Sequence, residues 1–154
     1  SQNQNFLPRL SGVMHLGYSW LGNREKLLFW QQFMRLLHAH LKDAEHLDKF
    51  YYELLNHAAM RFGKQNPRRI IVESYAEILK FEGRLHDEPY CFLCDEEILE
   101  NIALCRGFLP AHEHCAQRVG FAQDEILEFL RSKKTLNLND ETAERLYDIT
   151  LEGL

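Results

Sequence analysis

The chain has 154 residues, of which 45% are hydrophobic and 27% charged, a composition typical of a globular domain with its own core. Its formal net charge of −5 excludes a uniformly basic protein, so any surface for nucleic acid must be a local patch. No apolar run is long enough to span a membrane and no secretion signal opens the chain, so we expect no membrane contact.

Residues 1–22 do not show the pattern of a helix or of a long strand. They are rich in Asn, Gly, Ser and aromatic residues and include Pro8, so we predict an irregular N-terminal segment with at most short extended pieces. Because the first residue is Ser1 rather than Met, we interpret this segment as the remnant of a preceding domain.

Three amphipathic helices are predicted to follow. Asn23 is a suitable N-cap for the first, Asp43 for the second, and Asn66, which precedes a proline, for the third. Gly63 and Gly83 are suitable ends for the second and third. Apolar residues recur at steps of three and four, which places them on one face of each helix. The predicted buried faces are Leu27, Trp30, Met34, Leu37 and Leu41; Leu47, Phe50, Tyr51, Leu54, Leu55, Ala58 and Phe62; and Ile71, Tyr75, Ile78 and Leu79.

The second half of the chain interrupts this pattern with a cysteine-rich segment. Residues 86–118 lose the helical period and contain all four cysteines, so we predict an insertion that binds zinc. A short helix over residues 123–133 and a last helix opened by Asn139 or Asp140 complete the chain. The fold class is therefore predicted as mainly α: a helical bundle over residues 23–154 with an inserted zinc-knuckle, ribbon-like loop.

The cysteines and histidines of the insertion have the spacing of a zinc site. Cys91 and Cys94 form one pair with two residues between them, and His112 and Cys115 form another. Such turns let two side chains converge on one tetrahedral ion, and soft thiolates with one imidazole suit Zn²⁺. Four protein ligands leave no position for water, so we predict a structural zinc ion. Crowded cysteines without a secretion signal also favour a reducing compartment, the cytoplasm.

Alternatives remain open within this cluster. Cys105 can replace His112 and give a site of four cysteines, and His114 can replace it at a poorer spacing, one residue from Cys115. Buried free thiols without metal are a further interpretation, because cysteine is a common core residue. The spacing favours His112.

The sequence does not indicate an enzyme. His112 and His114 around Glu113 resemble a deaminase signature, but there the His-x-Glu precedes the cysteine pair, whereas here the order is reversed. The sequence contains no His-Glu-x-x-His helix, nucleophile elbow or phosphate-cradling Gly-rich loop. We therefore expect a binding or scaffolding role, with a zinc hydrolase or deaminase as the least favoured hypothesis.

A basic turn is the best candidate for contact with nucleic acid. Arg61, Lys64, Arg68 and Arg69 surround the connection between the second and third helices, with no acidic residue among them. They are predicted to contact phosphates, although a solvated turn explains them equally well. Trp20, Phe29 and Trp30 are aromatic residues that can stack on bases, but we predict that they belong to the core.

Several segments together resemble one known family, the bacterial recombination mediator RecO, and in particular a shorter, divergent branch of it. The resemblance covers nearly the whole chain, although only the cysteine knuckles are specific motifs. The segments that carry it are Leu7-Pro-Arg-Leu10, Gln31-Gln32, Lys64-Gln-Asn-Pro-Arg-Arg69, Glu73-Ser-Tyr75, Lys80-Phe-Glu-Gly-Arg-Leu85, Cys91-Phe-Leu-Cys94 and Phe108-Leu-Pro-Ala-His112.

The resemblance implies a function in DNA repair and recombination. Proteins of this family load the RecA recombinase onto single-stranded DNA coated with single-strand-binding protein, anneal complementary strands, and work with RecR. They have an N-terminal OB-fold and a helical domain that often carries a zinc site of four cysteines, where this chain has His112 at one position. An OB-fold needs more residues than 1–22 provide, so we expect it to be absent here or lost, which puts direct DNA binding in doubt. The competing hypothesis is a zinc-stabilised protein-interaction domain without a nucleic-acid role.

Overall fold

The computed structural model describes residues 18–154 and shows a mainly helical protein with one small sheet, which confirms the predicted fold class. Residues 1–17 of the predicted irregular segment lie outside the described residues. The elements in chain order are η1 (Ser19–Gly22), α2 (Arg24–Leu41), α3 (Lys49–Phe62), α4 (Pro67–Phe81), β1 (Ile102–Cys105), η2 (Arg106–Phe108), β2 (Leu109–His112), α5 (Glu113–Ala116), α6 (Gln123–Ser132) and α7 (Asp140–Thr150).

Most helices begin where the sequence predicts. The side chain of Asn23 accepts a hydrogen bond from the backbone of Lys26 at the start of α2, and Asn66 caps α4 in the same way. The start predicted for α3 was wrong: Asp48, not Asp43, is the N-cap, and its carboxylate accepts from the backbone N–H of Phe50. Asp43 follows the end of α2 by only two residues, which is too few for the chain to reverse direction before a new helix begins.

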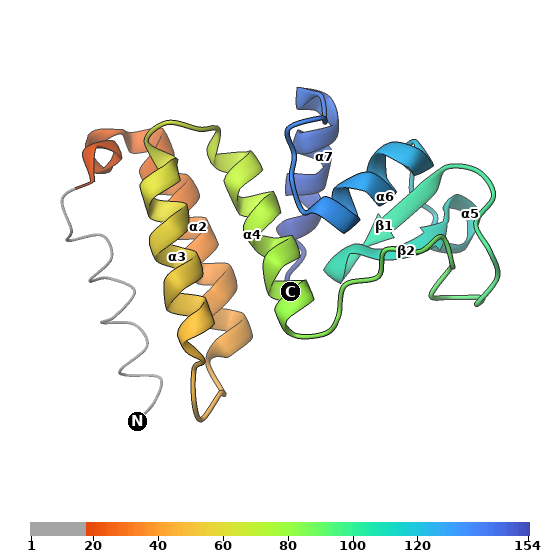
Figure 1. Cartoon of the computed structure of the whole chain (residues 1–154), viewed down its shortest axis with the longest axis horizontal. Helices are drawn as coiled ribbons and strands as arrows, with labels where there is room; N and C mark the ends of the chain where they lie inside the picture. Colours follow the sequence, from red (N-terminus) through yellow and green to blue (C-terminus); the bar gives the residue numbers. More distant parts are fainter. Residues whose placement is uncertain (1–17) are drawn as a thin grey trace.

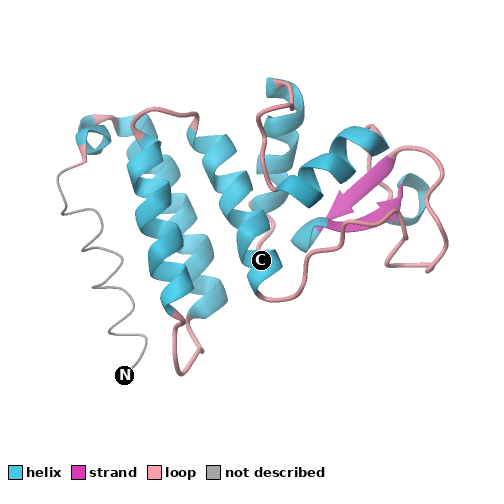
Figure 2. Cartoon of the chain, viewed as in Figure 1, coloured by secondary structure: helices cyan, strands magenta, loops and turns pink. Residues whose placement is uncertain are grey.

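The helices form a body at one end of the molecule, and the small sheet lies at the other. Figure 1 shows α2, α3 and α4 side by side, α7 beyond α4, and α6 running towards the strands. Figure 2 shows that β1 and β2 form a single hairpin among loops and short helices. One hydrophobic cluster extends from Trp20 to Leu154 through both ends, so the sheet packs on the same core as the helices.

Helix α4 is buried on almost every side. All seven residues from position 70 to position 76 are buried, including the polar Glu73 and Ser74. The one-face prediction for this helix was therefore too narrow, because α2, α3 and α7 all pack against it. Because α4 is enclosed, the carboxylate of Glu73 is buried and needs hydrogen-bonding partners, which a carboxylate on the exposed face of an amphipathic helix does not.

The carboxylate of Glu73 accepts three hydrogen bonds that meet this requirement. Arg61 of α3 donates to it at 2.7 Å, and Thr135 donates both its backbone N–H at 2.9 Å and its hydroxyl at 2.8 Å. Burial alone would raise the pKa of Glu73, but the hydrogen bonds from Thr135 and Arg61 outweigh it and hold this pKa below its ordinary value. Glu73 thus ties α3 and the connection between α6 and α7 to the central helix.

The cysteine-rich insertion is more ordered than a loop. β1 pairs antiparallel with β2, with Ile102 opposite His112 and Cys105 opposite Leu109. Phe108, at the turn between the strands, has a positive φ of 52° and is fully buried between the rings of Tyr75 and Phe129. A bulky residue rarely adopts this conformation, so its burial compensates for a local backbone strain. The hairpin turn therefore anchors the insertion to α4 and α6.

None of the helices within residues 18–154 combines the length and the apolar character needed to cross a membrane.

We predict that replacing Glu73 with Gln destabilises the fold by about 2 to 4 kcal/mol at neutral pH, because Arg61 then loses its buried counter-charge. The ionised carboxylate stabilises the fold fully above its ordinary pKa of 4.5, and this contribution is lost as the pH falls through the lower folded-state pKa. The difference between wild type and Glu73→Gln should therefore shrink below about pH 4.5. Urea unfolding at several pH values measures it, with the exposed Glu53→Gln on α3 as control. A difference that does not change with pH would contradict this account.

Candidate metal centre

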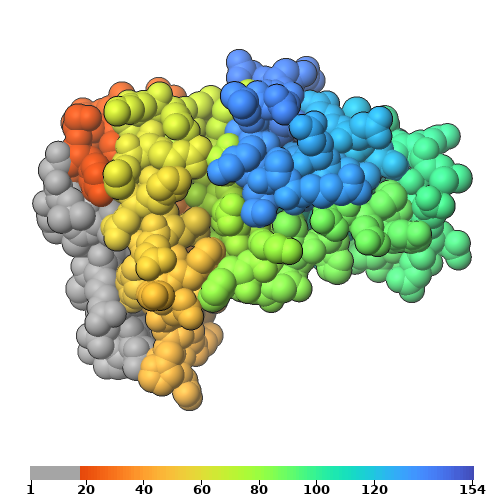
Figure 3. Space-filling model, viewed as in Figure 1, coloured from red at the N-terminus to blue at the C-terminus, as the bar shows by residue number. Residues whose placement is uncertain are grey.

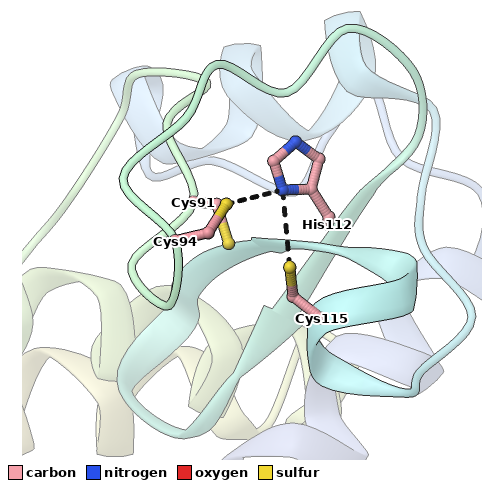
Figure 4. A group of neighbouring side chains, drawn as sticks. All are labelled: Cys91, Cys94, His112 and Cys115. Atoms are coloured by element: carbon pink, nitrogen blue, oxygen red, sulfur yellow. Dashed lines mark hydrogen bonds between the residues drawn. The ribbon is translucent and has the colours of Figure 1, made fainter.

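Four ligand side chains converge at the end of the molecule that carries the sheet. Cys91 and Cys94 lie in the loop before β1, His112 is the last residue of β2, and Cys115 lies in the short helix α5. Figure 4 shows the four side chains directed towards one another. The hairpin places the His112 pair opposite the Cys91 pair, as the spacing predicts, and the resulting Cys₃His group can hold a metal ion.

The distances fit a tetrahedral ion of the size of zinc. The Nδ1 atom of His112 lies 3.3 Å from the sulfur of Cys94 and 3.7 Å from that of Cys115. All four ligand atoms lie within 4.8 Å of one another. Zinc–nitrogen and zinc–sulfur bonds of about 2.1 and 2.3 Å at a tetrahedral angle separate the two ligand atoms by about 3.6 Å. The site therefore needs only small adjustments to close around an ion.

His112 is held in the orientation that metal binding needs. Its Nε2–H donates to the backbone carbonyl of Glu97 at 2.9 Å, which leaves the lone pair of Nδ1 directed at the sulfurs. This hydrogen bond also raises the pKa of His112. Metal-binding histidines commonly donate their second ring nitrogen to a carbonyl or carboxylate, which fixes the tautomer. The sequence has no signal for this contact, because the acceptor is a backbone atom.

Backbone groups support negative charge at Cys91. Burial alone would raise the pKa of this thiol, but backbone N–H groups of His112, Cys94 and Leu93 outweigh burial and lower it to about 6. Burial and the neighbouring Cys91 and Cys94 sulfurs raise the pKa of Cys115 to about 11. Without a cation, the cluster therefore favours one thiolate over three, and a bound divalent ion would supply the charge that lets the other thiols ionise.

A left-handed residue closes the first pair of ligands. Asp95, immediately after Cys94, has a φ of 66° and donates its backbone N–H to the carbonyl of Cys91 at 2.8 Å. Aspartate tolerates this conformation better than most residues, because its short side chain does not clash as larger ones do. The tight turn brings both cysteines to one side of the backbone.

The other residues weighed from the sequence do not join the ligand group. Cys105 ends β1 and lies outside the four-residue group, and burial raises the pKa of its thiol. His114 stacks on the ring of His112, with the ring centres 5.0 Å apart, and it too lies outside the group. Glu113 accepts a hydrogen bond from the backbone N–H of Gly120 at 2.7 Å, so its carboxylate supports the following loop.

The structure divides the four cations of the basic turn between different environments. Arg61 pairs with Glu73. Arg69 donates to the carbonyls of Thr135 and Leu138 and pairs with Asp140. The guanidinium of Arg68 lies 4.7 Å from the ring centre of Phe29, so it points to another side of α4. Of the four, Lys64 is exposed and the three arginines are half-buried.

A recess of about 500 Å³ lies beside this turn. Arg61 and Arg69 line it together with Lys134, Gln65 and Asn66, and Glu73, which pairs with Arg61, is the one acidic residue in its wall. Lys134 was not among the predicted cations, because it is far from the turn in the chain and the connection between α6 and α7 brings it near. Three cations and two amides are groups that bind phosphate oxygens.

Two of the three predicted core aromatics are buried as expected, whereas Phe29 is half-buried and packs against the edge of the core. Trp20 and Trp30 are buried in contact with each other and with Phe62, so neither presents a ring for base stacking. Trp20 donates its indole N–H to the carbonyl of Ala59 at 2.7 Å. The Trp30 indole N–H has no hydrogen-bond partner within residues 18–154, and nothing in the structure explains this.

Comparison with known proteins does not assign the chain to a family. No protein-family model matches the sequence. No curated protein matches it significantly either. The assignment of the metal site therefore depends on the geometry of its ligand residues and not on relatives.

We predict that Cys94→Ser lowers metal stoichiometry towards zero and lowers the melting temperature, because binding at sites of this kind supplies on the order of 10 kcal/mol of folding free energy. Metal analysis of natively purified protein and differential scanning calorimetry measure both effects. Metal-free wild type with a disulfide between these cysteines would contradict the prediction.

We also predict opposite results for the two alternative ligands. Cys105→Ala should keep one metal ion per chain, whereas His112→Ala should lose it or bind it weakly, because only His112 places a donor atom among the three sulfurs. A competition titration with a chromogenic chelator compares the two variants. Retention in His112→Ala with loss in Cys105→Ala would reverse the assignment.

Proposed function

We propose that the Cys₃His group binds one structural Zn²⁺ ion through Cys91, Cys94, His112 and Cys115. The observation that carries this proposal is the meeting of three sulfurs with the Nδ1 atom of His112, whose second ring nitrogen is already bound to a carbonyl. Soft thiolates select zinc over the harder cations Mg²⁺ and Ca²⁺, and a set of four protein ligands leaves no position for a reactive water.

We further propose that the chain is not an enzyme. Glu113, which lies between His112 and His114 in the chain, is the general-base candidate that the sequence offers, and its carboxylate accepts from the backbone of Gly120 instead. A catalytic zinc site would keep an open coordination position and an acid or base directed at it. The proposed role of the ion is to hold the loop before β1 against the hairpin.

The function that we propose is that of a DNA repair and recombination mediator module of the RecO kind, working in the cytoplasm. Two features support it: the resemblance of segments along nearly the whole chain, and the basic recess beside the α3–α4 turn. In this proposal Arg61, Arg69 and Lys134 hold phosphates of single-stranded DNA and Lys64 adds charge from the adjoining turn, while Arg68 is engaged with Phe29. RecR and single-strand-binding protein would be the protein partners, and loading of RecA the outcome.

A protein-interaction domain without a nucleic-acid role is the second candidate. The observation that favours it is the use of Arg61 and Arg69 inside the protein, where they hold Glu73 and the carbonyls after α6. Cations with such partners contribute less to phosphate binding than free ones, since a phosphate must compete with groups already in place. The two candidates predict different results with single-stranded DNA. Only the first predicts binding whose salt dependence decreases when these cations are removed.

We predict that Lys64→Gln with Lys134→Gln reduces the salt dependence of binding to single-stranded DNA. Both lysines are exposed and neither forms an ion pair within residues 18–154, so their loss removes charge without breaking the fold. Each phosphate contact contributes about 0.7 to the slope of log affinity against log salt for single strands, so the double variant should lose about 1.4. Titration of labelled oligonucleotides at several salt concentrations measures the slope.

A matched pair of exposed lysines at the opposite end of the helices provides the control. Lys42 and Lys49 flank the connection between α2 and α3, and Lys42→Gln with Lys49→Gln removes the same charge away from the recess. The control should keep the wild-type slope. Equal slopes for all three proteins, or no binding by wild type, would leave the protein-interaction domain as the supported function.

A further inference from the structure

The tip of the metal loop exposes large apolar side chains. We use the term knuckle tip for residues 88–100, which contain the first ligand pair. Tyr90, Phe92, Leu93 and Leu99 expose 52%, 40%, 52% and 80% of their surface. Phe92 and Leu93 are the two residues between the paired cysteines, and they lie outside because both cysteines turn inward towards the ligand group. Contiguous exposed apolar residues on a folded protein often mark a site of interaction.

Backbone pairing braces the loop that carries these side chains. Tyr90 bridges Glu97 in antiparallel fashion, and the backbone N–H of Ile98 donates to the carbonyl of Pro89 at 2.7 Å. Ile98 itself is buried and belongs to the main hydrophobic cluster, so it anchors the tip to the body. The apolar side chains are therefore presented on a braced loop, which reduces the conformational entropy lost on binding a partner.

In the sequence around these apolar residues, the acidic side chains are not balanced by any lysine or arginine. Neither lysine nor arginine occurs between Arg84 and Arg106, and the acidic residues in this interval are Asp87, Glu88, Asp95, Glu96, Glu97 and Glu100. None of these carboxylates forms an ion pair within the part of the chain that the structure describes. A Cys₃His site with three thiolates and a divalent ion adds a further charge of about −1.

We propose that the knuckle tip is a docking surface for a positively charged protein segment that carries large apolar side chains. The exposed aromatic and leucine side chains supply the contact area, and the carboxylates around them select and orient a basic partner. The same charge excludes nucleic acid from this surface, because phosphates would be repelled.

The position of the tip leaves room for such a partner. Figure 3 shows the green residues of this segment at the right-hand end of the molecule, away from α2 and α3. In Figure 1 the α3–α4 turn, beside the basic recess, lies at the other end. A basic partner at the tip and a phosphate at the recess would therefore not compete for space. The proposal does not depend on DNA binding, and it holds equally for an interaction domain without a nucleic-acid role.

Metal-loaded protein and short synthetic peptides test the proposal. The probes are fluorescein-labelled peptides in which Lys and Arg alternate with Leu and Phe, and matched peptides carry Glu in place of each basic residue. Basic peptides should bind wild type, more weakly at higher salt. Phe92→Ser with Leu93→Ser should weaken binding at least about tenfold, because these side chains supply the central contact area. Glu96→Gln with Glu100→Gln should weaken binding and reduce its dependence on salt.

Controls separate the tip from general attraction to an acidic protein. Leu136→Ser with Glu144→Gln alters an exposed leucine and an exposed glutamate outside the tip, and it should bind the peptides as wild type does. Metal content and melting temperature of each variant show that it is folded, and the charge variant tests the proposal should the serine variant fail to fold. Equal affinity of tip variants and wild type, equal binding of the Glu peptides, or no binding of any basic peptide would overturn the proposal.

Discussion

The burial of α4 is the constraint on which the rest of the structure depends. A helix with seven consecutive buried residues needs neighbours on every side, and α2, α3 and α7 supply them. The buried carboxylate of Glu73 then dictates where Arg61 and Thr135 must lie, since an unpaired charge there would cost several kcal/mol. Arg69 extends the same arrangement by donating to the carbonyls of Thr135 and Leu138. Two of the cations in the basic turn are therefore fixed by the core before any ligand is considered.

The same helix also positions the metal centre, through the contacts of one residue, Tyr75. The hydroxyl of Tyr75 on α4 accepts a hydrogen bond from the backbone N–H of Gly107 at 2.7 Å and donates to the carbonyl of Gly153 at 2.7 Å. Gly107 has a φ of 76°, which glycine adopts without strain, and this conformation lets the neighbouring Phe108 enter the core. Contacts with α4 thus orient the hairpin that carries His112. A bound ion would hold the loop with Cys91 and Cys94 against this hairpin. Core packing therefore stabilises the hairpin, and metal binding would stabilise the loop before β1.

The sequence predicts the parts of this arrangement that local chemistry determines. Helix starts at Asn23, Asn66 and Asn139 follow from capping, because each side chain satisfies a nearby backbone N–H. The ligand set follows from the two-residue spacing of the pairs. What could not be predicted depends on contacts between distant residues: the full enclosure of α4, the hairpin whose strands are too short to show a period, the carbonyl of Glu97 behind His112, and Lys134 in the basic recess. The start at Asp43 failed because capping identifies possible N-caps, and the space needed by the preceding turn decides among them.

The distribution of charge bears on both proposals. A net charge of −5 suggests a protein that repels nucleic acid, yet the charge is uneven, with acidic residues concentrated at the knuckle tip and cations beside the recess. At physiological ionic strength the screening length is about 8 Å, so each end acts on its own ligand largely independently of the other. Arg61 and Arg69 would each contribute little to phosphate binding, because both already have partners within the protein. Phosphate binding at this end would therefore depend most on Lys64 and Lys134, which form no ion pair within residues 18–154, and their loss would not alter the contacts that hold α4.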